Sequence, residues 1–442
     1  MARDTVFNFK SIEQLKKKLA QLSLNLPISN SINKLKQSLK IGSFELANRM
    51  VAQPMEGRDA DAKNHGPSPL TVRRYKRIAA GGFSLIWIEA TAVHSKGKSS
   101  CRQLQLTRQN LSQWKKMIST MRTAAYREWG HEPMIIIQLT HCGRWSKPKP
   151  LPAHHNQALP AGFRDKNGTE LISDDALDRL QDNFTKAASL AVAAGIDGVD
   201  FKAVHGYLTA ALLAAHTRPG KYGGSYYNRT RFLREGCKRI KNILKPPHFV
   251  TTRLSLQEPF AYPYGWGIKA AAGRMKTDLS EPLKLAQTLT EKAAMPLLNF
   301  SLGVPAVFPY LNRPASSNNM PGVEIPEHPL CSIVRFQNMG RQLQQNVKVP
   351  VVTAGLAWLQ HLGPYVMAGL LDQKWCRLIG QGRQLLAYPD AAGDLISKQT
   401  MTAAECCLTC SKCSQLMQQD KAVGCAVRDK KYYRSGAPAG TE

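Results

Sequence analysis

Residues 174–202 read DDALDRLQDNFTKAASLAVAAGIDGVDFK, and this stretch decides the fold. Its first part, Asp174–Ala194, is amphipathic and rich in alanine, which is typical of a helix that buries one face. Its last part, Gly198–Lys202, is a short apolar run, which indicates a buried strand. A helix that leads within a few residues into a buried strand is the repeating unit of parallel α/β folds.

The same strand signal recurs along the chain. Eight short runs, each separated from the next by a segment long enough for a helix, lie at Met50–Gln53, Leu85–Glu89, Met134–Leu139, Gly198–Lys202, Phe249–Leu254, Leu297–Ser301, Pro350–Ala354 and Cys376–Ile379. Eight such units over ~330 residues predict an α/β protein with a (β/α)8 TIM barrel. The alternative is an open doubly wound sheet, but no G-x-G-x-x-G follows the first run.

An extension is expected on each side of a barrel that covers residues 41–394. In residues 1–40, Ile12, Leu15, Leu19 and Leu22 repeat at helical spacing between lysines. This pattern favours an N-terminal helical extension that packs on the barrel over a helix that binds a partner. Residues 395–442 are polar, contain five of the ten cysteines and end in SGAPAGTE, so we expect a cysteine-rich segment and a tail there.

Composition narrows the class of protein. The 442 residues are 43% apolar, but no apolar run approaches the ~20 residues of a spanning helix, and MARDTVFNFK lacks the order of a secretory signal. We therefore expect a soluble, cytoplasmic protein with no membrane partner. The net charge of +29 is spread along the chain without a nucleic-acid motif, so no nucleic acid is expected. It indicates a solvated basic surface, or else an anionic ligand or an acidic partner protein.

Characteristic motifs follow the expected strands in order. They are NRMVAQPMEGRD (48–59), IEATAV (88–93), QLTHCGR (138–144), DGVDFKAVHGYL (197–208), RPGKYGGSYYNRTRF (218–232), TTRLS (251–255) and IGQGRQLLAYPD (379–390). Together they resemble the Old Yellow Enzyme family of NAD(P)H-dependent FMN oxidoreductases over residues 41–392. The later cysteines resemble the branch that includes 2,4-dienoyl-CoA reductase. That larger enzyme has a further FAD- and NADPH-binding portion, which we do not expect in these 442 residues.

The resemblance implies an FMN site at the C-terminal ends of the strands. Gln138 would meet the pyrimidine edge of the flavin, and Arg253 would face its N1–C2=O region, since an inward guanidinium needs an anionic partner. Gly355, Gly382 and Arg383 would cradle the FMN phosphate, where barrels often bind phosphate. The predicted cofactor-binding residues are Pro54, Met55, Glu56, Ala90, Gln138, Arg253, Gly355, Gly382 and Arg383.

The resemblance also implies a reaction. NAD(P)H would reduce FMN, which would pass hydride to the activated C=C of an α,β-unsaturated carbonyl or acyl compound. Lys202 and His205 would polarise the substrate oxygen, and Tyr207 would protonate the α-carbon, because a phenol can protonate only a strongly basic carbanion or enolate. The alternative is an FMN and iron–sulfur electron-transfer protein that reduces no alkene.

Two residues depart from the family pattern. Lys202 stands where the family presents a histidine, and it could stabilise an enolate oxygen or bind a carboxylate substrate. Glu56 stands where the family often carries threonine or cysteine, and it could face the flavin or turn away and pair with Arg58. The loop EPFAYPYGWG (258–267) could cover an apolar substrate or simply pack on itself.

The last cysteines form a ligand-like cluster. Cys407, Cys410 and Cys413 are spaced C-x-x-C-x-x-C, and Cys425 follows. Thiolates at this spacing can hold a metal site. The related reductases hold a [4Fe–4S] cluster there, with one more residue between the second and third cysteine. The resemblance therefore implies a [4Fe–4S] cluster, with zinc or free thiols as alternatives. Cys406 is an extra thiol, so a set of ligands that begins at Cys406 instead of Cys407 is also possible. Such a cluster would accept electrons from an acidic carrier protein.

Overall fold

A computed structural model describes residues 6–166, 168–271, 274–314 and 325–433. Its main sheet is parallel, with the order β7-β6-β5-β4-β3-β13-β12-β11-β8. The strands are β3 (Met50–Ala52), β4 (Leu85–Ala92), β5 (Met134–Thr140), β6 (Gly198–Phe201), β7 (Phe249–Thr251), β8 (Arg253–Gln257), β11 (Leu298–Leu302), β12 (Val351–Thr353) and β13 (Leu378–Gln381). Only Thr252 separates β7 from β8, so the two ends of this order are one interrupted strand. The sheet therefore closes as the predicted (β/α)8 barrel, and all eight expected strands are confirmed.

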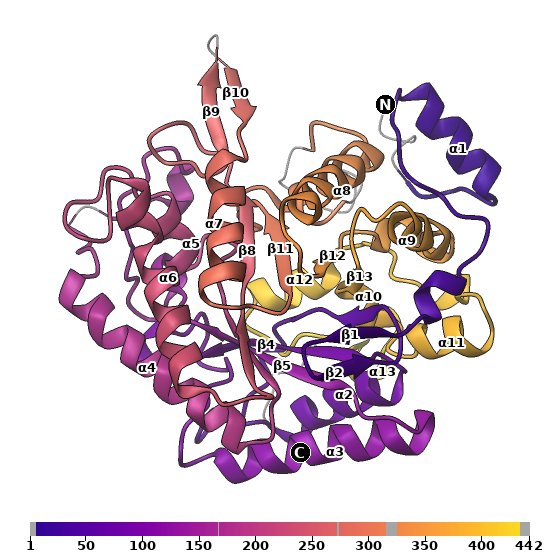
Figure 1. Ribbon diagram of the computed structural model, residues 1–442, viewed down its shortest axis with the longest axis horizontal. Helices are drawn as coiled ribbons and strands as arrows, with labels where there is room; N and C mark the ends of the chain where they lie inside the picture. Colours follow the sequence, from indigo (N-terminus) through magenta and orange to yellow (C-terminus); the bar gives the residue numbers. More distant parts are fainter. Residues whose placement is uncertain (1–5, 167, 272–273, 315–324, 434–442) are drawn as a thin grey trace.

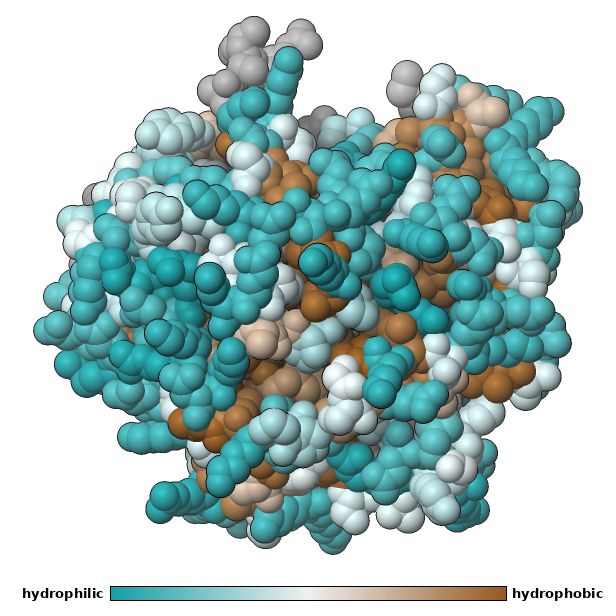
Figure 2. Space-filling view, viewed as in Figure 1, coloured by the Kyte–Doolittle hydropathy of each residue, from teal (hydrophilic) through white to brown (hydrophobic). Residues whose placement is uncertain are grey.

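Helices surround the barrel (Figure 1). The longest is α4 (Asp174–Ala193), which is the helix predicted from the opening stretch. The others that follow strands or cover them are α2 (Pro69–Ala80), α3 (Leu111–Trp129), α5 (Leu208–Leu213), α6 (Tyr226–Ile243), α7 (Ser280–Lys292), α8 (Pro329–Asn346), α9 (Gly363–Asp372), α10 (Arg383–Ala387) and α11 (Ala391–Ser397). No helix in the described ranges is long and apolar enough to cross a bilayer. The face in Figure 2 is mostly hydrophilic, with smaller hydrophobic areas between.

The apolar core has two parts, one inside the barrel and one between the barrel and its helices, because side chains alternate along each strand. In β4, Leu85 and Trp87 belong to the cluster that fills the barrel, whereas Ile86 and Ile88 belong to the cluster shared with the surrounding helices. Successive side chains of a strand point to opposite faces, so both faces of β4 are apolar and all eight of its residues are buried. This two-sided burial is the physical reason for the runs without alternation in the sequence.

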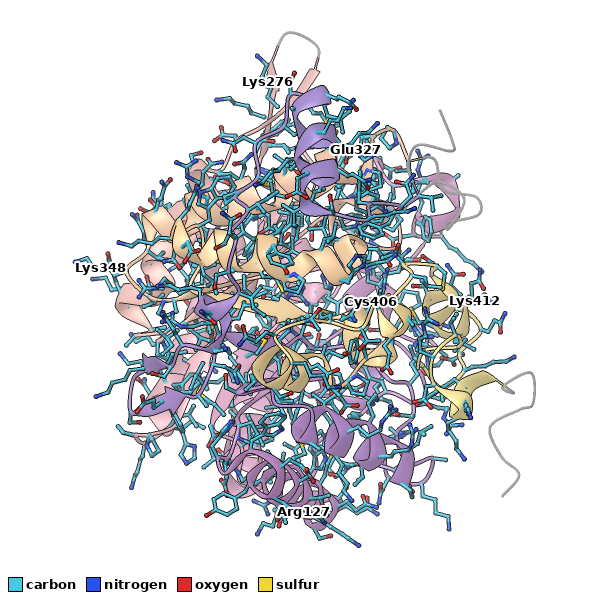
Figure 3. The ribbon with its side chains drawn as sticks, turned by 90° about the vertical axis from the view of Figure 1, so that its right-hand side faces the viewer. Arg127, Lys276, Glu327, Lys348, Cys406 and Lys412 are labelled. Atoms are coloured by element: carbon cyan, nitrogen blue, oxygen red, sulfur yellow. The ribbon has the colours of Figure 1, made fainter. Side chains whose placement is uncertain are left out.

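A hairpin that the sequence did not predict contributes to the core of the barrel. It consists of β1 (Leu39–Ile41) and β2 (Phe44–Leu46), paired antiparallel. Ile41 and Leu46 are buried in the same cluster as the inward side chains of the strands. The hairpin precedes β3 and supplies apolar side chains to the cluster inside the barrel. A second hairpin, β9 (Ile268–Ala271) and β10 (Arg274–Thr277), projects away from the barrel (Figures 1 and 3).

The N-terminal helix packs on the main body. It is α1 (Ile12–Gln21), and Ser11 caps its first turn by accepting the N–H of Gln14. Leu15 and Leu19 are buried in the cluster shared with the barrel helices. The apolar stripe of this helix is therefore covered by the chain itself.

The cysteine-rich segment lies against the loops after the first strands. It contains α12 (Lys412–Gln418) and α13 (Lys430–Tyr433). Asp429 binds Arg73 and Arg77 of α2 at 2.9 and 2.6 Å. Arg58, in the loop after β3, binds Asp420 at 2.9 Å. These ion pairs hold the segment beside the ends of the strands.

A buried ion cluster fixes the loop that follows β3. The Arg74 guanidinium binds Asp59 at 2.9 Å and Glu89 at 2.7 Å, and Glu89 also accepts the N–H of Gly57 at 2.7 Å. Burial raises the pKa of the Glu89 carboxyl to about 7, although Arg74 opposes that shift. The cluster ties α2 and β4 to residues 57–59.

We expect Arg74→Ala to lower the free energy of unfolding by about 3–5 kcal/mol, because it leaves two buried carboxyl groups without their cation. Arg127→Ala is the control, since that side chain is 83% exposed and its loss costs within about 0.5 kcal/mol. Urea unfolding followed by tryptophan fluorescence measures both. A loss for Arg74→Ala no larger than that of the control would contradict the structural role of the cluster.

Candidate active site

A cavity of about 590 Å³ lies at the C-terminal ends of the strands. Its lining includes every residue predicted to bind the cofactor or act in the reaction: Pro54, Met55, Glu56, Ala90, Gln138, Lys202, His205, Tyr207, Arg253, Gly355, Gly382 and Arg383. These residues come from seven strand ends that are spread over 330 positions of the sequence. The structure thus brings the whole predicted set to one place, while the role of each residue stays a prediction.

The turn after β6 presents three of them. His205 and Gly206 both have left-handed backbone, with φ of 68° and 67°. The buried Glu258 carboxylate, in the loop after β8, accepts the N–H of Gly206 at 2.9 Å and so holds this turn. Burial raises the pKa of the Glu258 carboxyl to about 7. The His205 imidazole lies 3.0 Å from the Ser301 hydroxyl at the end of β11.

Glu56 points toward the turn after β6. Its carboxylate accepts the Tyr207 hydroxyl at 2.7 Å and the Ser99 hydroxyl at 3.1 Å, and it lies 3.6 Å from the Lys202 ammonium. The Lys202 nitrogen also lies 3.5 Å from the centre of the Tyr207 ring. The alternative pairing of Glu56 with Arg58 is not found, because Arg58 binds Asp420 instead.

Burial changes the protonation of these groups. It lowers the pKa of the Lys202 ammonium, although the Glu56 carboxylate opposes that shift. It holds the pKa of His205 well below its ordinary value, with Arg253 and Lys202 acting in the same direction. It holds the pKa of Tyr207 well above its ordinary value, and Glu56 adds to that effect. His205 is therefore a neutral hydrogen-bonding group and Tyr207 a neutral phenol.

The predicted flavin-edge residues are held by Asp200, inside the barrel. Its carboxylate accepts the Gln138 amide at 2.6 Å, the Trp87 indole N–H at 2.8 Å and the backbone N–H of Arg253 at 2.8 Å. Burial raises the pKa of the Asp200 carboxyl to about 6. These contacts fix the orientation of Gln138 at the end of β5 and tie β8 to β6.

Arg253 is a buried cation, and Asp200 is the acidic group that acts on its pKa. Its guanidinium is 8% exposed, donates to the Phe300 carbonyl oxygen at 3.4 Å and forms no ion pair within the described residues. Burial lowers the pKa of this guanidinium to about 10. An unpaired buried cation is costly, so this place favours an anionic or electron-rich ligand.

The end of the cavity beside β12 and β13 offers backbone and amide groups. Gly355 has a φ of 88°, a conformation that side chains other than glycine rarely adopt. The Gln381 amide is 3% exposed, and neither of its polar atoms has a hydrogen-bond partner in the described part of the chain. An unsatisfied buried amide beside Gly382 and Arg383 fits a polar ligand.

Sequence reasoning missed several lining groups. Gln381 immediately precedes the predicted Gly-Arg pair, so its position at the end of a strand was a usable signal. Ser99 in the lining, and Glu258 behind the turn after β6, carry no local pattern that predicts their contacts. The aromatic side chains of residues 258–267 do not line the cavity: Trp266 and Phe260 are buried in packing and Tyr262 is exposed. Besides Tyr207, the aromatic lining comes from Trp145, Phe163 and Trp358.

The four predicted metal ligands, Cys407, Cys410, Cys413 and Cys425, line a second, smaller cavity. All four thiols are free of disulfide bonds. Backbone N–H groups of Thr409 and Arg428 donate to the sulfur atoms of Cys407 and Cys425 at 3.4 and 3.3 Å. Cys413 and Arg383 line both cavities, so the two sites are adjacent.

Cys406 does not belong to this set. It is fully buried in the apolar core, and it is absent from the lining of the small cavity; Figure 3 labels its position. The register that begins at Cys407 is therefore the one that surrounds the cavity. No group of three or more His, Cys, Asp or Glu side chains in the described ranges is arranged to hold a metal ion.

Known proteins share this architecture. A model of the NADH:flavin oxidoreductase / NADH oxidase family matches residues 34–271. An NADPH dehydrogenase of Halalkalibacterium halodurans is 30% identical over 281 residues, or 63% of this chain and 76% of that protein. An NADPH dehydrogenase of Bacillus velezensis is 29% identical over 208 residues, or 46% and 59%.

Among solved structures, a 2-naphthoyl-CoA reductase in complex with 2-naphthoyl-CoA has a TM-score of 0.73 at 19% identity. The match covers 92% of this chain and 58% of that one, and it shows the same fold. The chain therefore spans less than two thirds of the length of this protein and of the Bacillus velezensis dehydrogenase.

We expect Glu258→Gln to change how stability depends on pH. The pKa of the Glu258 carboxyl is about 7 in the folded protein and 4.5 in the unfolded chain. Folding therefore favours the protonated carboxyl. This contribution to the free energy of unfolding is present at low pH, and it is lost as the pH rises from 4.5 to about 7. The variant should therefore gain up to about 3 kcal/mol relative to the parent between about pH 4 and pH 8. Urea unfolding at both pH values measures this, and a constant difference would contradict it.

Proposed function

The chain belongs to the NADH:flavin oxidoreductase / NADH oxidase family, and from this premise we propose that it is an FMN-dependent ene-reductase. It passes hydride from NAD(P)H, by way of FMN, to the activated C=C of an α,β-unsaturated carbonyl or acyl compound. The observation that carries this proposal is the convergence of twelve predicted site residues on one cavity at the C-terminal face of the barrel. Ligands and chemistry in barrels of this kind are found on that face.

The cavity fits FMN in its donor set. Gln138, Pro54, Met55 and Ala90 would hold the ring system, and the unpaired Arg253 would face its electron-rich edge. The unsatisfied Gln381 amide, the glycine backbone and Arg383 would hold the phosphate-bearing end. When bound, FMN supplies a carrier that accepts hydride from NAD(P)H and delivers it to the alkene.

The protein's own side chains would handle the substrate oxygen and a proton. Lys202 and neutral His205 lie at one end of the cavity and would donate hydrogen bonds to the carbonyl oxygen, which stabilises the charge that develops there. Tyr207 beside them would protonate the α-carbon. The Glu56–Lys202 pair leaves little net charge near this end, which favours a neutral carbonyl group over a carboxylate.

The four cysteines support a second cofactor. They surround a small cavity with free thiols and two N–H donors to sulfur, a donor set that suits an iron–sulfur cluster. In a [4Fe–4S] cluster each cysteine binds a different iron, so the four sulfur atoms need not gather on one ion. We propose that Cys407, Cys410, Cys413 and Cys425 hold such a cluster, as in the 2,4-dienoyl-CoA reductase branch.

The adjacency of the two cavities favours a role in one-electron transfer as the alternative function. An acidic carrier protein would deliver electrons to the cluster, and the net charge of +29 would assist its encounter. Reduction by such a carrier should then become slower as the ionic strength rises. The same rate at low and high salt would remove the electrostatic part of this alternative.

We expect Tyr207→Phe to slow alkene reduction by about 10²–10⁴-fold, because the α-carbon loses its proton donor. Flavin reduction by NAD(P)H is a separate half-reaction and should persist. Stopped-flow absorbance with an enone measures the two steps separately. An unchanged rate of alkene reduction would remove Tyr207 from the mechanism.

We expect Cys413→Ser to lose most of the bound iron and acid-labile sulfide, because it removes one of four ligands. Cys101→Ser is the matched control, since Cys101 is exposed and lies outside the small cavity. Iron and sulfide analysis of anaerobically purified protein measures both. Equal iron in the two variants, or no iron in the parent, would contradict the cluster assignment.

A further inference from the structure

Lys202 is a buried amine at the wall of the large cavity. It follows β6 directly, it lines the cavity, and its side chain is only 4% exposed. Its ammonium lies 3.6 Å from the Glu56 carboxylate and 3.5 Å from the centre of the Tyr207 ring. A direct charge-assisted hydrogen bond would be about 2.7–2.9 Å long, so Glu56 does not hold the ammonium in this way. A ligand in the cavity can therefore reach the Lys202 nitrogen.

Burial makes this nitrogen more nucleophilic. It lowers the pKa of the Lys202 ammonium, because a charged group loses its hydration in a buried place. The acidic neighbours Glu56, Cys142 and Asp200 oppose that shift, and the Arg253 guanidinium adds to it. The neutral amine is the form of lysine that attacks a carbonyl carbon, and burial of the side chain is one way in which proteins obtain it.

We propose that Lys202 is a catalytic nucleophile, which forms an iminium (a protonated Schiff base) with the carbonyl carbon of the substrate. The inference rests on the proposed ene-reductase function and deepens it, because it narrows the substrate class to α,β-unsaturated aldehydes and ketones. An acyl compound such as a thioester would instead lose its leaving group and leave Lys202 blocked as an amide. A hydrogen bond from Lys202 to the carbonyl oxygen brings the nitrogen close to the carbonyl carbon before the covalent bond forms.

The covalent step balances in atoms and charge. Glu56 accepts one proton from the Lys202 ammonium, and the neutral amine attacks the carbonyl carbon. A second proton passes from the nitrogen to the substrate oxygen, which becomes the hydroxyl group of a carbinolamine. Glu56 then returns its proton to that hydroxyl group, the C–O bond breaks and water leaves. The products are a cationic iminium that keeps one N–H, a water molecule and the Glu56 carboxylate, and no oxidation state changes.

The iminium prepares the substrate for hydride. Its positive charge withdraws more electron density from the C=C than a carbonyl group does, so the β-carbon accepts hydride more readily. The cation forms beside the Glu56 carboxylate and the face of the Tyr207 ring, and both stabilise positive charge. Hydride addition gives a neutral enamine, and protonation of its α-carbon, as in the proposed function, gives the iminium of the saturated compound. One water molecule then releases the product and the Lys202 ammonium.

Reductive trapping tests the proposal without turnover. The FMN-loaded protein is incubated in air with 2-cyclohexenone and sodium cyanoborohydride, without NAD(P)H, and its intact mass is measured. Reduction of an iminium leaves a stable secondary amine, so we expect one adduct with the mass of the ketone less one oxygen atom. A peptide map should place it on Lys202. No adduct on Lys202 would overturn the proposal, and so would an adduct with the full mass of the ketone, which marks addition to the C=C.

Lys98 is the matched control. It is a second buried lysine, 8% exposed, and burial lowers its pKa as well, but it lies outside the lining of the cavity. We expect Lys98→Arg to keep the adduct and Lys202→Arg to lose it, because arginine keeps a cation but has no neutral amine to react. Equal labelling of Lys98 and Lys202 in the parent would overturn the proposal, since burial alone would then explain the reaction.

Glu56→Gln tests the proton transfer. Glutamine cannot take the proton from the Lys202 ammonium, so we expect the adduct to form about 10²-fold more slowly. Glu132→Gln alters a carboxylate that is 51% exposed and pairs with Arg122 at the surface, and it should react at the parental rate. Equal rates in the three proteins would overturn the assignment of the proton transfer to Glu56.

A second measurement uses cyclohexanone, a saturated ketone, in water enriched in the heavy oxygen isotope. Each cycle of iminium formation and hydrolysis replaces the carbonyl oxygen by one from solvent, so the parent should exchange it at least about 10²-fold faster than Lys202→Arg. Equal exchange in the two proteins would overturn the proposal. Neither measurement needs hydride transfer. A protein that forms the adduct but reduces no enone would refute only the proposed function, whereas one that reduces enones without adduct or exchange would refute only the iminium.

Discussion

Closure of the parallel barrel is the constraint on which the site depends. Because β7 pairs with β6 and β8 pairs with β11, the sheet has no free edge among the barrel strands, and every strand ends on the same face. Residues as distant in sequence as Pro54 and Arg383 therefore line one cavity. The inner apolar cluster fills the barrel beneath, and the buried Arg74 cluster holds the loop after β3 in position. The catalytic face is thus a consequence of how the core is closed.

The charged side chains that line the cavity determine which ligands the C-terminal face of the barrel can bind. Its described lining carries several cations but a single carboxylate, Glu56. Arg253 forms no ion pair, and the side-chain amide of Gln381 has no hydrogen-bond partner within the described residues, so this end of the cavity favours a polar, electron-rich ligand. Lys202 and Glu56 neutralise one another next to Tyr207. The cavity therefore combines an end that suits an electron-rich ligand with a nearly neutral end beside Tyr207.

Much of the fold and of the candidate site could be predicted from the sequence, because the signals for the strands and for the motifs after them are local. Two-sided burial gives runs such as Leu85–Glu89 their apolar character, and each site motif follows its strand directly. The contacts of Glu56 with Tyr207 and of Glu258 with Gly206 could not be predicted, because each joins positions 151 or 52 residues apart. The β1–β2 hairpin was also missed, since three-residue strands are too short for a periodic pattern. The sequence likewise could not show that Cys407 lines the small cavity while Cys406 lies in the core, because this depends on where the fold places each thiol.

An anaerobic absorbance spectrum of the purified protein, recorded before and after NADH is added, tests the central claim most directly. The account predicts flavin bands with a broad iron–sulfur shoulder, both bleached by NADH. Flavin bands alone would keep the oxidoreductase and remove the cluster from the account. A protein without flavin bands, even after reconstitution with FMN, would contradict the assignment of this cavity, because Gln138, Arg253 and Arg383 would then not form a flavin site.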